Sequence, residues 1–417
     1  MDLQPQSIWN GREIPLLHHT LTNNNIFWNQ SNSLDFIQRK KKVCNVSLLP
    51  VSPIDPINTA LLTVAEDRIS GFHRLPFHTI AEQSGLDVHT VIDRLKAMME
   101  AGVVRRVRQT LLATKLAQGA LVAWDIPEDR LNSAFEWLQH KDPFTGHVVL
   151  RTTDINNPGA NYKLWTTLKV PIGCGTLDDH CTLLSSIIGA SHYILLPAHG
   201  IFALSVGHLR RRSLKPGDKL PQPAPMSTTT KVELSSEEWD ILLSLKEQLT
   251  LDEMVENPWQ HRAASLGISL EHFYEIAEQL DQKKVIGRFA TFLEHVKPQT
   301  DDGPITRFNG LFHWSVPHGM EQQAGAECGR HLCMTHCYWR TGGQAFGNAQ
   351  IMGVVHGLEK EAVLAHKAAI DAHLTNCGIP ILHTAVFWGI RSEIKPSEIS
   401  PAIYHQWLAS IRQIISF

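Results

Sequence analysis

An internal repeat constrains the fold of this chain more than any other feature of its sequence. Aromatic, histidine and arginine residues recur in the same order in the two halves of the 417 residues. The matched pairs, at offsets of 190, 189, 189 and 182 residues, are Trp124 and Trp314, His147 and His336, Arg151 and Arg340, and Arg106 and Arg288. An insertion near residues 298–304 absorbs the smaller offset. A long collinear repeat of this kind indicates two homologous modules in one chain.

Each module begins with the pattern of a winged helix-turn-helix. In the first, a short helix over residues 75–85 ends at a glycine, and Asp87 can cap a second helix that has an apolar stripe. Gly102 ends this helix, and residues 103–107 follow as a strand. Two short helices that meet at a glycine-bearing turn and precede a strand are typical of this motif. The second module repeats the pattern with helices over 237–249 and 268–280 and a strand over 285–289.

A ferredoxin-like pattern follows each winged helix. Residues 119–126, 146–153, 161–170 and 191–205 read as strands, and residues 129–140 and 177–188 read as helices. The order β-α-β-β-α-β is typical of the ferredoxin-like arrangement. We therefore expect an α+β fold of two tandem modules, each a winged helix-turn-helix followed by a ferredoxin-like βαββαβ domain.

This organisation predicts seven segments. They are a poorly ordered arm (1–52), the first winged-helix domain (53–112), the first ferredoxin-like domain (113–212), a proline-rich linker (213–230), the second winged-helix domain (231–296), the second ferredoxin-like domain (297–395) and a C-terminal helix (396–417).

Charge and composition exclude several classes of protein. The chain has 38 basic and 41 acidic residues, and a bulk nucleic-acid binder usually has a clear basic excess. A hydrophobic fraction of 43% argues against a disordered chain, and no apolar stretch reaches the length of about 18 residues that a membrane span needs. The N-terminus lacks the layout of a signal peptide, and seven cysteines without framework spacing fit reduced thiols. We expect a cytoplasmic protein.

Short motifs in both halves resemble one known family. Those of the second half are at 285–289, 311–317, 335–340 and 354–357, and those of the first half are at 104–107, 123–130, 146–147 and 162–168. The module resembles the AsnC/Lrp regulators, and within that group it looks like the siroheme decarboxylases of heme d1 synthesis and of the siroheme-dependent route to heme. The resemblance covers roughly residues 57–205 and 237–391, with one half similar to each of two homologous subunits.

The resemblance implies an enzyme, a carboxy-lyase that removes CO2 from ring acetates of siroheme to give didecarboxysiroheme. It implies no cofactor beyond the iron of the tetrapyrrole substrate. The sequence departs from the family pattern in each half. Val149 occupies the position of a tyrosine in the first, and residues 347–350 replace a Pro-Tyr-Asn segment in the second.

The candidate site residues follow from strand periodicity. Side chains at i, i+2 and i+4 of a strand share a face, so His336 lies with Tyr338 and Arg340. An imidazole, a phenol and a guanidinium on one face can transfer a proton and hold a carboxylate. We expect His336 to be a proton donor or the ligand of the substrate iron. The predicted catalytic residues are His336, Tyr338 and His147, and the predicted substrate-binding residues are Arg340, Arg151, Arg106, Arg288, Trp165, His313 and His356.

Cysteine spacing does not predict a metal centre of the protein's own. Four residues separate Cys328 from Cys333, and three separate Cys333 from Cys337. These spacings fit neither paired zinc ligands nor a plant-type iron–sulfur cluster. We expect these to be structural cysteines, and we interpret Cys174 and Cys181 in the same way. The run at residues 210–212 is interpreted as a solvated basic edge.

Partner predictions follow from the charge of the two recognition-type helices. The first, residues 87–101, has two basic and three acidic residues, and the second, residues 269–282, has four acidic and no basic residues. DNA affinity comes largely from basic residues that contact the phosphates, so we expect no DNA partner. We also expect no membrane partner. We expect siroheme or a related tetrapyrrole, and an internal pseudo-dimer, with a homo-oligomer left open. The alternatives are an AsnC/Lrp-type ligand-sensing regulator and a non-catalytic heme- or tetrapyrrole-binding protein.

Overall fold

Eight strands from the two halves of the chain close into one barrel. The structure is a computed structural model that describes residues 49–205, 207–228, 230–297 and 300–415. The predicted arm of residues 1–52 therefore lies, up to residue 48, outside the described residues. Around the barrel the strand order is β10-β8-β11-β4-β5-β3-β6-β9, and neighbouring strands are antiparallel.

The elements of the first half agree closely with the predicted order. Its helices are α2 (Pro56–Ala65), α3 (Pro76–Ser84), α4 (Val88–Glu100), α5 (Leu131–His140) and α6 (Leu177–Ile188). Its strands are β1 (Ile69–Ser70), β2 (Val104–Leu111), β3 (Ala117–Asp125), β4 (Thr145–Thr152), β5 (Tyr162–Pro171) and β6 (His192–Leu204). Gly85 ends α3 in the left-handed conformation at φ 70°, and the Asp87 side chain accepts hydrogen bonds from the first turn of α4.

The second half repeats this order and adds a terminal helix. Its helices are α7 (Ser236–Lys246), α8 (Trp259–Ser265), α9 (Leu270–Gln282), α10 (Glu321–Gly329), α11 (Lys360–Asn376) and α12 (Pro401–Ile415). Its strands are β7 (Ile286–Leu293), β8 (Phe308–Ser315), β9 (Met334–Arg340), β10 (Ile351–Gly357) and β11 (His383–Ile394).

The sequence predicted a ferredoxin-like domain in each half, and in the structure the strands of both halves form one closed barrel. The four strands of the first half follow one another in the order β4-β5-β3-β6, and those of the second half follow as β9-β10-β8-β11. Their edges then meet, because β11 pairs with β4 and β6 pairs with β9. Pairing both edges leaves no open strand edge around the barrel. Residues of both halves therefore face one common interior.

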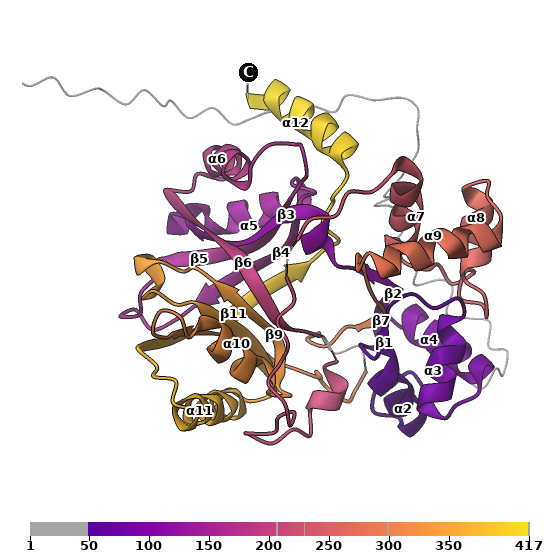
Figure 1. Cartoon of the computed structure of the whole chain (residues 1–417), viewed down its shortest axis with the longest axis horizontal. Coiled ribbons are helices and arrows are strands. Elements are labelled where there is room, and N and C mark those ends of the chain that lie inside the picture. The colour runs from indigo at the N-terminus through magenta and orange to yellow at the C-terminus, as the bar shows by residue number, and fades with distance from the viewer. Residues whose placement is uncertain (1–48, 206, 229, 298–299, 416–417) are drawn as a thin grey trace, which may run out of the picture. The chain divides into compact units, whose positions relative to one another are not determined.

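Helices α5 and α6 of the first half and α10 and α11 of the second half cover the outside of the barrel (Figure 1). Strand alternation divides every strand between this outer layer and the interior. Val148 and Leu150 of β4 pack in a core with Phe135 of α5 and Leu184 of α6. On the side of the second half, residues of β9 and β10 pack with those of α10 and α11. A further cluster, which includes Trp165, Leu311, Phe346 and Phe387, combines both halves and fills part of the interior.

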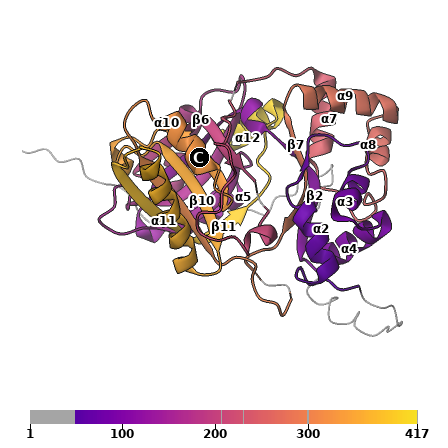
Figure 2. The same ribbon diagram turned by 60° about the horizontal axis from the view of Figure 1, so that its bottom comes forward.

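A second, three-stranded sheet also joins the two halves. Its order is β1-β7-β2, so the strands that follow the two recognition-type helices pair with each other (Figure 2). Helices α2–α4 and α7–α9 share a single hydrophobic core with this sheet. Arg106 of β2 and Arg288 of β7 extend from it to the barrel, where they donate hydrogen bonds to the carbonyl oxygens of Ile394 and Leu204.

Candidate active site

His147, Val149 and Arg151 of β4 form a triplet equivalent to His336, Tyr338 and Arg340 of β9, and these two strands lie opposite each other in the barrel. Strands β4 and β9 are separated by three strands in either direction. His147 and Arg151 alternate with Val148 and Leu150, which belong to the outer core, so the triplet of β4 faces inward. On β9 the residue between His336 and Tyr338 is Cys337, whose thiol contacts the carbonyl oxygen of Gly325 in α10. The triplet of β9 therefore also faces the interior.

On β9 the three side chains form one stack. The rings of His336 and Tyr338 are nearly parallel, at 17°, with their centres 6.2 Å apart. The Arg340 guanidinium lies over the Tyr338 ring at 4.4 Å, within the range of a cation–π interaction. His336 is bonded through Nδ1 to the Thr335 hydroxyl at 3.2 Å. Among the described residues its Nε2 atom has no hydrogen-bond partner, so this atom is available to a ligand.

On β4 the corresponding residues do not form a stack. His147 Nε2 is 2.7 Å from the Ser392 hydroxyl of β11, so the nitrogen that is open in His336 is occupied here. Arg151 donates to Asn309 Oδ1 at 3.1 Å and to the carbonyl oxygen of Phe387 at 3.3 Å. Val149 is buried between them and has no polar atom to offer.

His313 and Trp165 lie within the barrel, among aromatic rings. The His313 ring is 4.7 Å from that of Phe387, 5.6 Å from Phe346 and 6.0 Å from Trp165. Its side chain is almost fully buried, and neither ring nitrogen has a partner among the described residues. Trp165 donates its indole N–H to the carbonyl oxygen of Tyr162 at 2.8 Å. A buried imidazole without a partner is costly, and it is a candidate for contact with a ligand.

A cluster of three further histidines lies beside His336, and the sequence analysis identified only His356 among them. The rings of His208 and His295 stack at 3.9 Å, and the His356 ring is 4.9 Å from His208. His356 Nε2 is 3.1 Å from the Asn309 amide, and its Nδ1 is 3.3 Å from the Thr335 hydroxyl.

The two histidines that the analysis missed are at loop positions. His208 follows β6, and His295 follows β7. Neither lies on a strand with alternating polarity, so periodicity could not place them. The high histidine content was the only signal in the sequence that pointed to them.

Burial keeps these imidazoles neutral. It lowers the pKa of His147 and His336 to about 3, with further contributions from Arg151 and Arg288 respectively. Burial and the neighbouring arginines also lower the pKa of His313 to about 3 and that of His295 to about 4. The pKa values of His208 and His356 are well below the usual value for the same reason. A neutral imidazole has a free lone pair, which is the form that binds a metal.

Four guanidinium groups lie around this interior. Arg340 donates to the carbonyl oxygen of Leu196, and Arg151, Arg106 and Arg288 likewise donate to backbone oxygens. Among the described residues none of the four forms an ion pair. Burial lowers the pKa of Arg151 and of Arg340 to about 10. The Nε atoms of Arg151 and Arg288 have no acceptor. Uncompensated positive charge at this density is suited to an anion.

The interpretation of residues 210–212 as a solvated edge is wrong for Arg210 and Arg211. Both guanidinium groups pair with the buried carboxylate of Asp67, at 3.0 and 3.5 Å. Burial opposes the charge of Asp67, but the two arginines outweigh it and lower the pKa to about 2. The neighbouring Glu66 accepts hydrogen bonds from the backbone N–H groups of His208 and Leu209. The basic run therefore anchors the loop that carries His208.

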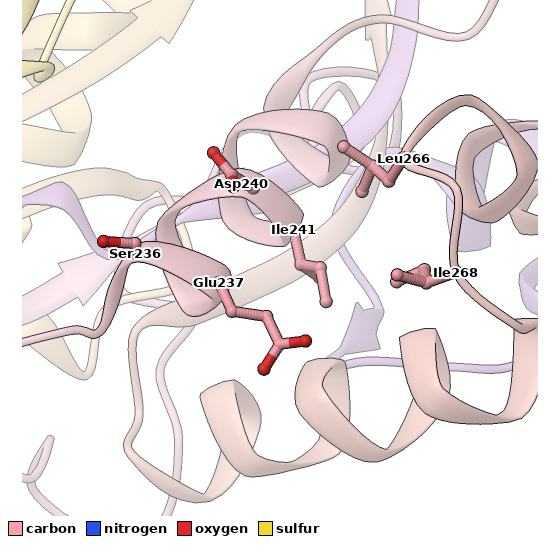
Figure 3. A pocket seen from close by; sticks show the side chains of 6 residues that line it. All are labelled: Ser236, Glu237, Asp240, Ile241, Leu266 and Ile268. Carbon is pink, nitrogen blue, oxygen red and sulfur yellow. The ribbon is translucent and has the colours of Figure 1, made fainter.

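The surface hollows lie away from these residues. One, of about 360 Å³, is formed by α7 and the segment after α8, and is lined by Ser236, Glu237, Asp240, Ile241, Leu266 and Ile268 (Figure 3). Another, of about 420 Å³, is lined by residues that include Ile155 and Lys163. Neither hollow includes a predicted site residue.

The cysteines singled out by the sequence analysis do not form a ligand set. Cys328, Cys333 and Cys337 are buried in the outer layer. Burial raises the pKa of Cys333 to about 12 and that of the other two thiols further. These thiols are held in their protonated form. Among the described residues no helix is long and apolar enough to cross a membrane.

Comparison with known proteins points to one enzyme. No family model matches the chain. A siroheme decarboxylase of Hydrogenobacter thermophilus is 24% identical over 289 residues, which are 69% of this chain and 80% of the relative. The siroheme decarboxylase NirH subunit of Stutzerimonas stutzeri is 26% identical over 123 residues, covering 30% of this chain and 69% of that subunit.

Solved structures of one enzyme have the same fold. The siroheme decarboxylase NirDL in complex with an iron-uroporphyrin III analogue matches with a TM-score of 0.60 and 18% identity, covering 86% of this chain and 99% of that chain. A crystal structure of NirDL, described without that analogue, matches with a TM-score of 0.59, 85% of this chain and 99% of that chain. The chain is a homologue of the siroheme decarboxylases.

Proposed function

We propose that this protein is a siroheme decarboxylase that removes CO2 from ring acetates of siroheme to give didecarboxysiroheme, in heme d1 or heme biosynthesis. The observation that carries the proposal is the set of four arginines, without carboxylate partners, around the common interior. The relatives are named siroheme decarboxylases, and one similar structure contains an iron-uroporphyrin analogue. Tetrapyrroles of this class carry acetates and propionates, which guanidinium forks bind well.

The arginines serve as anchors for carboxylates that do not react. A guanidinium paired with the reacting acetate would stabilise its charge in the ground state and slow the loss of CO2. We therefore assign Arg340, Arg151, Arg106 and Arg288 to the other carboxylates of the macrocycle. The reacting acetate is then held in the apolar part of the site, where desolvation of its charge favours release of neutral CO2.

The chemical step needs a proton but no oxidant. The bond between the acetate methylene and its carboxyl carbon breaks, CO2 leaves, and the electron pair stays on the methylene carbon. One proton then converts this carbon to a methyl group. His336, with its open Nε2 atom, is the candidate donor, and Tyr338 and His147 are assigned as its helpers.

The low pKa of His336 restricts how it can act. In the protein without substrate the imidazole is neutral at pH 7, because burial and Arg288 disfavour its charged form. The carboxylates of a bound tetrapyrrole would reverse this local field and raise its pKa. His336 is thus either charged by substrate binding and donates the proton, or remains neutral and binds the substrate iron. We propose that the reaction uses no cofactor beyond that iron.

The macrocycle is assigned to the end of the barrel that adjoins the three-stranded sheet. There Arg106 and Arg288 reach the barrel, and the His208–His295 pair lies beside His356. These groups would contact the macrocycle when the substrate binds. Trp165 and His313 then form the wall of the site on its inner side.

We also propose the finer organisation that the repeat suggested. The domains are those at residues 53–112, 113–212, 231–296 and 297–395, as two copies of a winged helix and a ferredoxin-like domain. The matching strand orders β4-β5-β3-β6 and β9-β10-β8-β11 support this assignment. The two copies would form an internal pseudo-dimer through the barrel.

A DNA-binding regulator is less well supported. Glu271 and Glu278 on the second recognition-type helix form exposed ion pairs with Arg74 of the first half. These acidic residues therefore hold the two helical regions together, and the helix offers no basic face to phosphate.

Anaerobic incubation with siroheme tests the proposed function. We expect the mass of the tetrapyrrole to fall by that of one or more CO2 molecules, and the loss to vanish in His336→Ala. A shifted absorbance spectrum without a mass change would instead support the tetrapyrrole-binding alternative. No spectral change and no mass change would remove siroheme as the substrate.

A further inference from the structure

Three side chains of the types that bind metals converge between α10 and α11, outside the barrel. They are Glu327 of α10, His373 of α11 and Cys377, which directly follows α11. Their ligand atoms all lie within 4.8 Å of one another. His373 Nε2 is 2.6 Å from a Glu327 carboxylate oxygen and 3.6 Å from the Cys377 sulfur. Both figures of the whole chain place α10 and α11 along the outside of the strands of the second half (Figure 2).

The spacing is close to that of a tetrahedral zinc site. Bond lengths of about 2.1 Å to nitrogen and 2.3 Å to sulfur put those two ligands roughly 3.6 Å apart around the ion. The observed distance between His373 Nε2 and the sulfur matches this value. The nitrogen and the carboxylate oxygen, now in direct contact, would need to separate by about 0.8 Å. A side-chain rotation of Glu327 is enough for that.

His331 lies beside this group, outside the 4.8 Å within which the other three ligand atoms gather. Only 2% of it is exposed, yet neither of its ring nitrogens has a hydrogen-bond partner among the described residues. Its ring centre is 5.1 Å from that of His373. An ion pair between His373 and Glu327 accounts for those two residues alone. It explains neither the buried imidazole without a partner nor the thiol at ligand distance.

Arg330 competes for the carboxylate but does not block it. Its guanidinium donates at 3.0 Å to Oε2 of Glu327, the atom that His373 also contacts. A carboxylate has two oxygens, so one can remain with Arg330 while the other binds an ion. Glutamate, histidine and thiolate ligands together favour Zn²⁺ over hard ions such as Mg²⁺.

We propose that Glu327, His373 and Cys377 bind one Zn²⁺ ion, and that the His331 ring moves closer on binding to become the fourth ligand. Binding displaces the thiol proton of Cys377 and any proton on the two imidazoles, with no redox change. The ion would join α10 to α11. It would also fix the turn at His331, which leads directly into β9 with His336. The role is therefore structural support of the strand that carries the candidate catalytic residues.

Cobalt is the sharpest probe, because the chain has 23 histidines that can bind metals weakly. Only a thiolate ligand gives the sulfur-to-Co²⁺ charge-transfer absorption in the near ultraviolet. We expect the full chain to show this band with one equivalent of Co²⁺, and Zn²⁺ to abolish it. Cys377→Ser should remove the band and weaken Zn²⁺ binding on the order of tenfold or more.

Cys174→Ser is the matched control. Cys174 is also partly buried and lies 3.7 Å from a histidine, His405, but it has no third ligand. This variant should keep the Co²⁺ band and the Zn²⁺ affinity. A band that is absent from the parent protein, that survives Cys377→Ser, or that is lost equally in the control would overturn the proposal.

A measurement on the unaltered chain covers the case in which Cys377→Ser does not fold. Alkylation of each cysteine is followed by mass spectrometry with and without Zn²⁺. Zn²⁺ should slow the labelling of Cys377 at least tenfold and leave that of Cys174 unchanged. Equal labelling rates at Cys377 with and without the metal would refute the site, whatever the outcome for siroheme.

Discussion

Strands β4 and β9 occupy equivalent places in the two halves, yet their inward-facing residues differ in what they can do. Both strands carry a histidine and an arginine four residues apart. On β9 Tyr338 stacks with His336 and under Arg340, and the histidine has an open nitrogen. On β4 Val149 breaks the stack, and the same nitrogen of His147 is bonded to Ser392. From this comparison we propose that the arginines of both strands bind carboxylates, whereas the proton donor lies on β9 alone.

The largest effect is expected when the histidine of each strand is replaced, because here the two strands should differ most. Replacing His336 by Ala should lower the rate of CO2 release by about 10²- to 10⁴-fold, the range of a general acid. His147→Ala should cost at most about tenfold, because its ring is already engaged with Ser392. Single-turnover assays with product mass would measure both. Equal losses in the two variants would mean that both halves catalyse.

Converting β9 to the pattern of β4 should have the next largest effect. Tyr338→Val removes the ring under Arg340 and the neighbour of His336, and we expect a loss of about 10- to 100-fold in kcat/KM. Tyr338→Phe keeps the ring and is the matched control for the hydroxyl. If Tyr338→Phe is as damaging as Tyr338→Val, the hydroxyl takes part in the reaction. If it behaves like the parent, the stack is what matters.

Replacing the arginines should have the same effect on the two strands. Arg340→Lys and Arg151→Lys each keep the charge but lose the planar fork that binds a carboxylate. We expect both to raise KM by about tenfold, which corresponds to about 1.4 kcal/mol, with little change in kcat. Initial rates over a range of siroheme concentrations test this. A large change in kcat for only one of them would place that arginine at the reacting acetate.

The pH dependence of stability should also be similar for the two strands. Burial lowers the pKa of His147 and of His336 to about 3, against about 6.5 in the unfolded chain. Below pH 6.5 the unfolded state binds protons that the folded state does not, so the free energy of unfolding falls as the pH drops from about 6.5 towards 3.

Removing either histidine should reduce this slope by up to about 1.4 kcal/mol per pH unit. Urea unfolding of His147→Gln and His336→Gln at several pH values measures it. Above pH 7 both variants should have the slope of the parent. A slope that remains unchanged at pH 5 would mean that the imidazole is charged in the folded protein.

The sequence was informative where regular periodicity carried the signal. The marker pairs predicted the order of the elements, and strand alternation placed His336 with Tyr338 and Arg340. It could not predict that β6 would pair with β9 and β11 with β4, because contacts between edges depend on the twist of both sheets. His208 and His295 were not predicted for a related reason, because they lie in loops whose positions depend on tertiary packing.

The metal-ligand group between α10 and α11 was missed because its members are far apart in sequence. Glu327 and His373 are brought together by helix packing, whereas spacing along the sequence indicates only ligands that are close in the chain. The basic run at 210–212 was misinterpreted because its partner, Asp67, lies in the first helical region. Such pairs need a known fold before they can be recognised.

The closed barrel has a consequence for how the two halves can change over time. Both strand edges of each half pair with the other half of the same chain. Each half therefore always pairs with a partner of different sequence, and the covalent link keeps the effective concentration of that partner high. Separate subunits of this kind would also form pairs of identical copies, in which every substitution appears twice. A tethered pair escapes that constraint. One half can then carry a valine at position 149 while the other keeps Tyr338, and we expect one complete set of residues to be enough for the shared interior.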